Sequence, residues 1–520
     1  MFAAVYGMTV LGLQAHLIRV EVDVANGLPS FDIVGLATTA VREARDRVRS
    51  AIRNSGYQFP LQRVTVNLAP ADLRKEGSGL DLPIAIGILA ATGQCLLPSV
   101  VQYVLAGELS LEGTLRPVPG VLTMAITLDR ENLESNLDGG RISETLSLIV
   151  PPDNLAEARL VTGLDTYSTA SLAQIVKGIE DKGCFEEGEL SRTPQIELSN
   201  VVNVDWADVY GQQHAKRALE IAAAGGHNVI LVGPPGSGKT LLAKAYSGIL
   251  PQLSELESIE VTQLYSVCGL LNCNGTLVQH RPFRSPHHTV TKAGMIGGGR
   301  DLRPGELSFA NHGVLFLDEL PEFAREVLEC LRQPLEDREL TITRQSGSIT
   351  YPAHVSVIAS MNPCPCGFFG DQGRVCHCTP LQIQNYRGRI SGPLLDRFDM
   401  HVEVPRLNYS ELKNNIAYEY STVVRERVMT ARQNQWVRLG STKTNAEMTA
   451  KETKEFGKLT PSGESLLQKI FDSQHLSARA HDRILRVART IADLGGSEDI
   501  LPEHLAEAIQ FRALDKRLQI

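Results

Sequence analysis

Residues 228–240 read NVILVGPPGSGKT, and this stretch decides how the central part of the chain folds. Residues 229–232 form an uninterrupted apolar run, which predicts a buried strand, and the LLAKAYSGIL of residues 241–250 predicts a helix. Between them, residues 233–240 match G-x-x-x-x-G-K-[ST], a loop whose glycines let backbone N–H groups curl around an anionic phosphate. The order strand, glycine loop, helix therefore predicts a nucleotide-binding P-loop.

The P-loop residues have distinct predicted roles in binding ATP and Mg²⁺. Lys239 is expected to reach the β- and γ-phosphates, and the hydroxyl of Thr240 is expected to hold Mg²⁺. The backbone of the loop and the start of the helix complete the predicted nucleotide site, which consists of Gly233, Pro234, Pro235, Gly236, Ser237, Gly238, Lys239, Thr240 and Leu241.

Two later apolar runs end in polar residues that fit such a site. GVLFLDEL (313–320) carries Asp318 and Glu319 directly after four apolar residues. A carboxylate at the end of a strand beside the P-loop can hold the Mg²⁺ shell, and the next can deprotonate the attacking water. We therefore assign Asp318 to the metal and Glu319 to the general base. HVSVIASMNP (354–363) predicts another buried strand, which ends in the polar Asn362.

Length and composition indicate a globular protein of several domains. The chain has 520 residues, of which 43% are hydrophobic and 21% charged, and this length suggests about three domains. The net charge of −8 argues against a whole surface that coats nucleic acid, but it leaves a local basic channel open. His16 and Arg19 interrupt the apolar start, so we predict a cytoplasmic protein without signal peptide or membrane span.

The pattern along the chain divides it into four parts. Residues 1–178 alternate strand-like and helix-like segments and predict an α/β module, and residues 179–203 are polar and acidic, which is typical of a linker. Residues 204–405 contain the strands and P-loop of the ATPase core. Residues 406–520 show helical spacing throughout and predict an all-helical region.

A cysteine-rich loop follows the strand that ends at Asn362. Four of the nine cysteines are Cys364, Cys366, Cys376 and Cys378, which lie within residues 363–380. Four thiolates can hold a structural Zn²⁺, which would stabilise a loop that has little core of its own. The alternative is four reduced cysteines without a metal.

Several segments resemble the YifB/ComM family of magnesium-chelatase-like AAA+ ATPases. They are MNPCPCGFFG (361–370), YRGRISGPLLDRFD (386–399), SARAHDRILRVARTIADL (477–494) and the opening MFAAVYGMTVLGLQAHLIRVEVDVANGLPSFDIVGL (1–36), and the similarity covers nearly the whole chain. The resemblance implies an AAA+ core with a parallel sheet, a C-terminal helical lid, and a homo-oligomeric ring, with a hexamer as the expected form. It implies a branch-migration motor on single-stranded or branched DNA that supports recombination or natural transformation together with recombination proteins. The alternative is a chelatase-like or protein-remodelling ATPase whose N-terminal domain binds a protein partner.

The same resemblance implies roles for residues that no local pattern assigns. Asn362 corresponds to sensor 1, which positions the attacking water. Arg397 corresponds to an arginine finger that reaches a neighbour's nucleotide, and its alternative is an ion pair with Asp396 or Asp399. Arg479 matches sensor 2 in the lid. Further implied positions are Val209, Tyr210 and Gly211 near the adenine, with Arg483 and Arg486 as rivals of Arg479.

The N-terminal module resembles the Lon-protease-like domain, a ribosomal-S5-domain-2-like fold. Lon-type proteases use a serine and a lysine, and the comparable turn here carries Ser78. The position of the lysine holds Leu122 or Thr123, and Lys75 lies only three residues from the serine. Without an amine to take the hydroxyl proton we predict no peptidase activity, and we expect a scaffold or regulatory domain.

Two glycine- and arginine-containing segments of the core are candidates for contact with DNA. Residues 283–313 form a long insertion, and residues 339–354 alternate like a hairpin around residues 345–348. A ring would concentrate their positive charge around a strand of nucleic acid, although subunit packing is the alternative role. The predicted DNA contacts are Lys292, Arg300, Arg303 and Arg344, and Arg281 and Arg284 add to the positive charge of the first segment.

Overall fold

The computed structural model divides into two compact units. Unit 1 comprises residues 1–199 and 255–278, and unit 2 comprises residues 200–254 and 279–520, so the chain passes between the units three times. The structure describes residues 1–36, 39–75, 77–97, 103–138, 145–181, 185, 204–271, 276–299, 302–344, 347–371, 373–407, 419–474 and 477–512. The predicted linker 179–203 lies almost wholly outside these residues, and Arg300 lies outside them as well.

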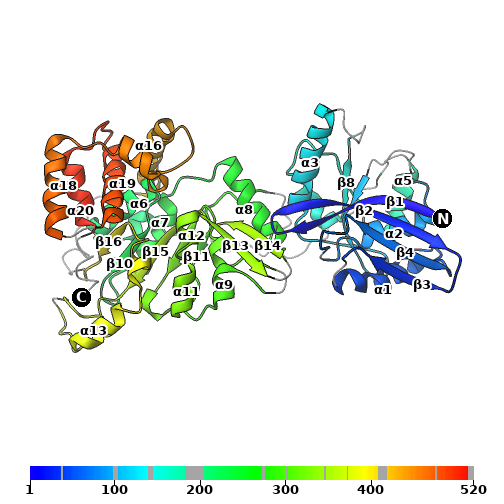
Figure 1. Cartoon of the computed structure of the whole chain (residues 1–520), viewed down its shortest axis with the longest axis horizontal. Helices are drawn as coiled ribbons and strands as arrows, with labels where there is room; N and C mark the ends of the chain where they lie inside the picture. The colour runs from blue at the N-terminus through cyan, green and yellow to red at the C-terminus, as the bar shows by residue number, and fades with distance from the viewer. Residues whose placement is uncertain are drawn as a thin grey trace. The chain divides into compact units, whose positions relative to one another are not determined.

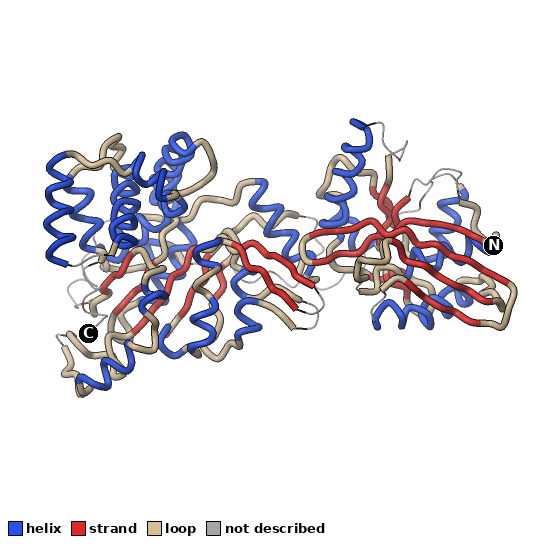
Figure 2. The backbone as a smooth tube through the Cα atoms, in the orientation of Figure 1, coloured by secondary structure: helices blue, strands red, loops and turns tan. Residues whose placement is uncertain are grey.

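Unit 1 contains a mixed seven-stranded sheet with helices packed on it (Figures 1 and 2). Its strand order is β3-β4-β2-β1-β5-β8-β9, and β1 pairs antiparallel with β2 from Phe2↔Asp23 to Leu11↔Gln14. Alternating side chains of β2 are buried because one face of the sheet packs on the apolar helix α2. The strands are β1 (Phe2–Leu11), β2 (Gln14–Ala25), β3 (Ser30–Val34), β4 (Arg63–Ala69), β5 (Tyr103–Leu105), β6 (Glu108–Leu109), β7 (Leu115–Arg116), β8 (Ser147–Val150) and β9 (Thr166–Ser168). The helices are α1 (Thr39–Asn54), α2 (Asp81–Ala91), α3 (Val121–Asp138), α4 (Pro152–Ala158) and α5 (Leu172–Glu180).

Helix α8 (Glu255–Val267) belongs to unit 1, although its sequence lies between elements of the ATPase core. It packs against α3 and buries Val261, Leu264 and Tyr265. The carbonyl of Ser266 accepts a 3.0 Å hydrogen bond from the Gly120 N–H, and the Ser266 hydroxyl donates to the carboxylate of Glu157. The sequence analysis did not predict this placement.

Unit 2 is built on a five-stranded sheet whose strands are all parallel. The order is β11-β12-β15-β10-β16, so the strand of the P-loop lies beside β15, and β15 lies beside the strand that precedes Asp318. These strands are buried on both faces, which explains their continuous apolar sequences. The strands are β10 (Val229–Val232), β11 (Phe283–Arg284), β12 (Val314–Leu317), β15 (Ser356–Met361) and β16 (Met400–Glu403), and β13 (Glu339–Arg344) pairs with β14 (Gly347–Pro352) in a separate hairpin.

Helices surround this sheet and form a lid at the end of the chain. Figure 1 shows the lid helices α16, α18, α19 and α20 grouped together in orange and red, and α16 and α19 both pack on α6. The helices of the core are η1 (Trp206–Asp208), α6 (Gln213–Gly225), α7 (Lys239–Ile249), α9 (Lys292–Ile296), α10 (Glu306–Phe309), η2 (Leu320–Glu322), α11 (Arg325–Cys330), α12 (Pro334–Asp337), α13 (Pro380–Arg387) and α14 (Gly392–Leu395). Those of the lid are α16 (Ser421–Leu439), η3 (Asn445–Glu447), α17 (Ala450–Phe456), α18 (Pro461–Gln474), α19 (Ala478–Leu494) and α20 (Pro502–Gln510). The predicted α/β class, with a parallel-sheet core and a helical C-terminal region, is confirmed.

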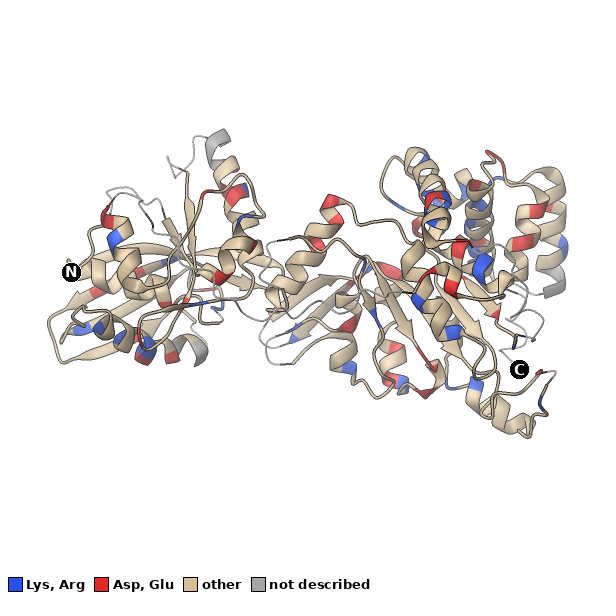
Figure 3. Cartoon of the chain, turned by 180° about the vertical axis from the view of Figure 1, so that it is seen from behind, with Lys and Arg blue, Asp and Glu red and all other residues tan. Residues whose placement is uncertain are grey.

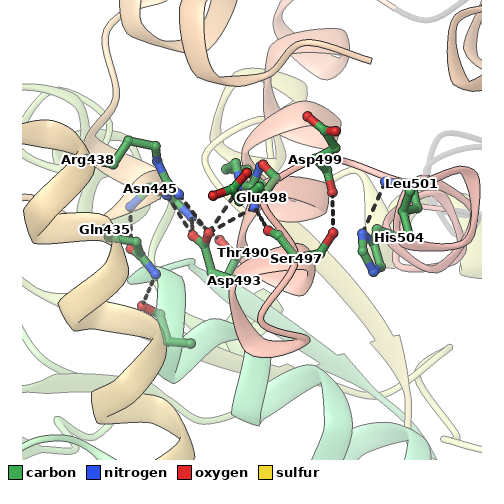
Figure 4. A network of polar contacts seen from close by, with 12 residues as sticks. Gln435, Arg438, Asn445, Thr490, Asp493, Ser497, Glu498, Asp499, Leu501 and His504 are labelled. Atoms are coloured by element: carbon green, nitrogen blue, oxygen red, sulfur yellow. Dashed lines mark hydrogen bonds and ion pairs between the residues drawn. The ribbon is translucent and has the colours of Figure 1, made fainter. Parts of the chain in front are cut away.

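A buried charge network ties the lid helices together (Figure 4). Asp493 on α19 is 4% exposed and accepts two 2.7 Å hydrogen bonds from the guanidinium of Arg438 on α16. It also accepts hydrogen bonds from Arg489, at 3.1 Å, and from Asn445, at 2.8 Å. A single carboxylate therefore compensates two arginines, which makes its charge essential to this packing.

Charged residues of both signs lie on the described lid helices. Figure 3 shows basic and acidic residues mixed along the lid helices. Among the residues that the structure describes, no helix combines the length and the hydrophobicity needed to cross a bilayer.

Candidate functional site

The predicted P-loop forms the wall of a cavity of about 410 Å³. Gly236 and Gly238 have φ angles of +77° and +91°, which place their backbone in a region that favours glycine. The loop turns sharply there between β10 and α7. The residues that line the cavity are Pro235, Gly236, Ser237, Gly238, Lys239, Thr240, Leu241, Asp318, Glu319, Ser360, Met361 and Asn362. Segments far apart in the sequence thus meet at the carboxyl ends of three neighbouring strands.

The ammonium group of Lys239 points into the concave side of the loop. It donates hydrogen bonds to the carbonyls of Gly233 and Pro234, at 2.7 and 2.9 Å, and lies 3.4 Å from Oδ1 of Asn362. Burial lowers the pKa of Lys239, and the nearby carboxylates Asp318 and Glu319 oppose this shift. A phosphate group would supply an anionic partner for this half-buried cation.

Oxygen ligands suited to Mg²⁺ converge beside the lysine. Thr240 Oγ1 lies 3.1 Å from Asp318 Oδ2, and the Ser360 hydroxyl donates to Oδ1 of the same carboxylate. A hydroxyl and a carboxylate are ligands that a hard cation such as Mg²⁺ prefers, so these residues fit the ion that the P-loop chemistry requires.

Glu319 is oriented by an unusual backbone conformation. Its φ is +54°, which is uncommon for a residue with a side chain, and its N–H donates to Ser360 Oγ at 3.2 Å. Ser360 therefore fixes both acidic residues, because it contacts the carboxylate of Asp318 and the backbone of Glu319. Ser360 is not among the site residues predicted from the sequence. Its only signal is a small polar residue at a buried position of an apolar strand.

The predicted adenine-side residues lie next to the P-loop but outside the lining of this cavity. Gln212, which follows Tyr210 and Gly211, donates hydrogen bonds to the carbonyls of Ser237, at 3.2 Å, and Pro405, at 2.7 Å. Gly211 has a φ of +57°, and Tyr210 is exposed. This segment is thus attached to the loop through Gln212, another residue that the sequence analysis did not identify.

Arg397 and Arg479 line a second cavity in unit 2, of about 550 Å³. Among the described residues, the lining of the P-loop cavity includes neither arginine. Arg483 and Arg486, the predicted rivals of Arg479, line the second cavity as well. The structure therefore brings the arginine-finger and sensor-2 candidates together, and it does not bring Arg479 to the P-loop of its own chain.

The predicted alternative partners of Arg397 are wrong. Its guanidinium pairs with the carboxylate of Glu336 and donates to the Arg332 carbonyl at 3.4 Å. Asp399 instead lies 3.4 Å from the His227 ring and 3.5 Å from Arg483. Although burial raises the pKa of Asp399, hydrogen bonding to His227 and the charge of Arg483 hold it well below its usual range.

The two basic segments of the core pack against each other. The Tyr351 hydroxyl on β14 donates to the Leu302 carbonyl at 3.0 Å, and a Cβ built on Gly298 would lie 3.8 Å from the Arg344 guanidinium. Lys292, Arg303 and Arg344 are exposed.

Arg284 of the first segment and Arg281, which lies just before this segment, are used within the fold. Arg284 forms a two-pronged pair with Glu306, with both distances 2.7 Å. Arg281 donates to the carbonyls of Pro251 and His312 at 2.6 Å. The charge available to a ligand on this surface is therefore smaller than the sequence alone indicates.

The remaining candidates are the cysteines and the N-terminal serine. The four predicted cysteines lie together, and their Sγ atoms are within 4.8 Å of one another; we call Cys364, Cys366, Cys376 and Cys378 the tetracysteine cluster. In unit 1, the Ser78 hydroxyl donates to the carboxylate of Glu108, and the buried Lys75 ammonium donates to the Pro70 carbonyl.

Family comparisons match the chain in three consecutive parts. Residues 20–137 match the model for subunit ChlI of Mg-chelatase, residues 205–412 match magnesium chelatase, subunit ChlI, and residues 418–512 match its C-terminal part. The competence protein ComM of Haemophilus influenzae is 43% identical, with 99% of this chain and 98% of that protein covered. The protein YifB of Escherichia coli is 44% identical over 99% of this chain and 97% of its own length. The magnesium-chelatase 38 kDa subunit of Cereibacter sphaeroides is 24% identical over 38% of this chain.

Proposed function

Because the chain belongs to the YifB/ComM family of magnesium-chelatase-like AAA+ ATPases, we propose that it is an ATP-hydrolysing ring motor that acts on DNA. The proposed activity is translocation or branch migration on single-stranded or branched DNA, in support of recombination or natural transformation. The name competence protein, which the Haemophilus influenzae relative carries, supports that setting.

In the proposed hydrolysis, each residue of the P-loop cavity has a defined task. Lys239 would exchange the Gly233 and Pro234 carbonyls for the terminal phosphates, while Thr240 and Asp318 would hold Mg²⁺. The ion neutralises charge that develops on the phosphates. Glu319 removes the proton of the attacking water, and Asn362 orients that water from the end of β15.

The separation of the two arginines from the P-loop cavity is the observation that carries the ring proposal. An arginine that stabilises the transition state must contact the γ-phosphate, and Arg397 and Arg479 line a different cavity of the same unit. A second copy that places its P-loop at this cavity would receive both arginines at once. Such a contact joins two different surfaces and closes into a ring, for which we propose six copies.

The paired basic segments support DNA as the substrate. Lys292, Arg303 and Arg344 are exposed on two segments that pack together, so one subunit presents them as one surface. A ring would repeat this surface around its axis, where it would attract phosphates in a salt-dependent manner.

The test is ATP turnover of the purified protein with and without forked, four-way and single-stranded DNA, read beside its mass in solution. We expect DNA to stimulate turnover and the mass to correspond to several chains. Lys292→Ala with Arg344→Ala should reduce the stimulation and its salt dependence, whereas Lys451→Ala, an exposed lysine of α17, serves as the matched control. Equal turnover on every DNA and in its absence would reject the DNA assignment.

A second candidate function is remodelling of a protein partner bound to the N-terminal unit. The observation in its favour is α8, a helix of the core sequence that unit 1 holds through α3 and Glu157. A conformational change of the core during hydrolysis would then be transmitted to unit 1 through α8. A partner that co-purifies at high salt, together with DNA-independent turnover, would favour this function.

A further inference from the structure

The tetracysteine cluster has the geometry of a single-ion site. The Sγ atoms of Cys364 and Cys366 are 3.4 Å apart, and that of Cys376 lies 3.7 and 3.6 Å from them. These separations exclude disulfides, which need about 2.05 Å between sulfur atoms. They are close to the edge of about 3.8 Å that a tetrahedron has when its centre binds each thiolate sulfur at about 2.3 Å. These three sulfurs, with the Cys378 sulfur within 4.8 Å of each of them, suit one Zn²⁺ rather than an iron–sulfur cluster, whose irons separate the thiolates.

The loop around the cluster has too few apolar contacts to fix its own conformation. Phe369 and Val375 are 48% and 77% exposed, and only Cys364 of the four ligands is buried. In a short segment of this kind, the free energy of metal binding can offset the conformational entropy that is lost when the loop becomes ordered.

The cluster is attached to the nucleotide cavity at three points. Gly367, with a φ of +84°, lies so close to the P-loop that a Cβ on it would meet Pro235 Cδ at 2.5 Å. Helix α13 begins at Pro380, with Thr379 between it and Cys378, and its Arg387 donates to the Pro363 carbonyl at 3.2 Å. The Tyr386 hydroxyl of the same helix lies beside the backbone of Asn362. The segment that contains the cluster thus begins beside the cavity at Asn362, and its last residues, Tyr386 and Arg387, lie again beside Asn362 and Pro363.

We propose that the tetracysteine cluster binds one structural Zn²⁺, and that this ion positions Asn362 for ATP hydrolysis. Four protein thiolates complete the tetrahedral shell, so the ion has no open position for substrate. Its effect on turnover is exerted through Asn362, which makes the cysteines positioning residues. The binding of zinc is independent of the proposed function, whereas the effect on turnover rests on the ATPase activity.

The first test measures metal in protein purified without chelators. We expect about one zinc per chain, a loss of that zinc in Cys376→Ser and Cys378→Ser, and full zinc in Cys330→Ser, a half-buried cysteine of α11 outside the cluster. If a variant does not fold, release of zinc from the wild-type chain by a mercurial reagent, followed with a coloured chelator, gives the same count. Absence of zinc, an iron–sulfur absorption band, or equal zinc in all variants would overturn the assignment.

The second test asks whether zinc acts through sensor 1. Removing zinc should lower kcat by about 10²-fold, with a smaller change in KM for ATP, because a displacement of about 1 Å at a reacting centre has this effect. In Asn362→Ala, which retains the four cysteines, removing zinc should cause little further loss. If removing zinc lowers kcat in Asn362→Ala by as large a factor as in the wild type, the ion does not act through this residue. Zinc content and the response to DNA are separate readouts, so failure of one proposal is distinguishable from failure of the other.

Discussion

The ring proposal makes a quantitative prediction about mixtures of two inactive variants. Lys239→Ala removes the cation that binds the phosphates but keeps Arg397 and Arg479, and Arg397→Ala keeps its own nucleotide cavity. Each variant alone should be nearly inactive, since loss of an arginine finger costs on the order of 10³-fold or more in turnover. A mixture should regain activity, because the first variant can donate its arginine to the cavity of the second.

The size of the recovery follows from the separation of the two cavities. In an equal random mixture half of the subunits have an intact cavity, and half of their neighbours carry Arg397, so about one quarter of the interfaces are complete. Turnover should therefore rise to about one quarter of the wild-type value, far above either variant alone.

The assay is phosphate release after subunits are exchanged at high salt without nucleotide. Mixing Arg397→Ala with a chain that carries both substitutions is the control, and it should give no recovery. Because Arg397 pairs with Glu336, fluorescence of the two tryptophans, Trp206 and Trp436, should first confirm that unit 2 is folded. If the turnover of the mixture is only the average of the two variants' turnovers, Arg397 does not act on the nucleotide cavity of a neighbouring chain.

Three further predictions concern single residues. Glu319→Gln should bind a fluorescent ATP analogue normally and lose about 10²–10⁴-fold in phosphate release, as expected for removal of a general base; unchanged release would reject that role. Asp493→Asn should lower the free energy of unfolding of unit 2 by about 3–5 kcal/mol, measured by tryptophan fluorescence in urea, because the buried Arg489 and the half-buried Arg438 lose the charge of this carboxylate. Asp482→Asn on the same helix, whose side chain is 41% exposed, should cost under about 1 kcal/mol, and equal costs would contradict the network. The pKa of Glu447 is raised by burial, but a hydrogen bond from His354 and the charge of Arg338 outweigh this effect and lower the pKa from 4.5 to about 2. By this shift the carboxylate of Glu447 contributes about 3 kcal/mol to the free energy of unfolding above pH 4.5, and this contribution declines as the pH falls toward 2. The free energies of unfolding of wild type and Glu447→Gln, measured by urea titration, should therefore become more similar as the pH is lowered from 7 to 3.5.

The parts of the site that are predictable from sequence are those encoded by consecutive residues. The P-loop specifies its own geometry, because the glycines with positive φ, the lysine and the preceding strand lie within residues 228–240. Asp318 and Asn362 could be placed at the site because each follows an apolar run, and parallel strands bring their carboxyl ends to one edge of the sheet. The similarity to YifB and ComM proteins confirms the family that these motifs indicate.

The unpredicted features are choices between partners distant in sequence. Arg397 had two acidic residues close by in the chain, yet the fold places it against Glu336 on α12, 61 residues away. Ser360 supports both carboxylates although one serine in an apolar strand has no distinctive pattern. Arg284 is neutralised by Glu306, which only the packed insertion brings near. The charge pattern and the periodicity of a sequence do not show which residues far apart in the chain come into contact.

The placement of α8 limits how the protein can be divided for study. A truncated chain that starts at residue 200 would retain this helix and lose α3, so the apolar side chains of Val261, Leu264 and Tyr265 would face water. Likewise, protease cleavage near residue 190 would leave the amino-terminal fragment attached without a covalent bond. Recombinant fragments intended to isolate the motor need to omit residues 255–278 or substitute their apolar positions.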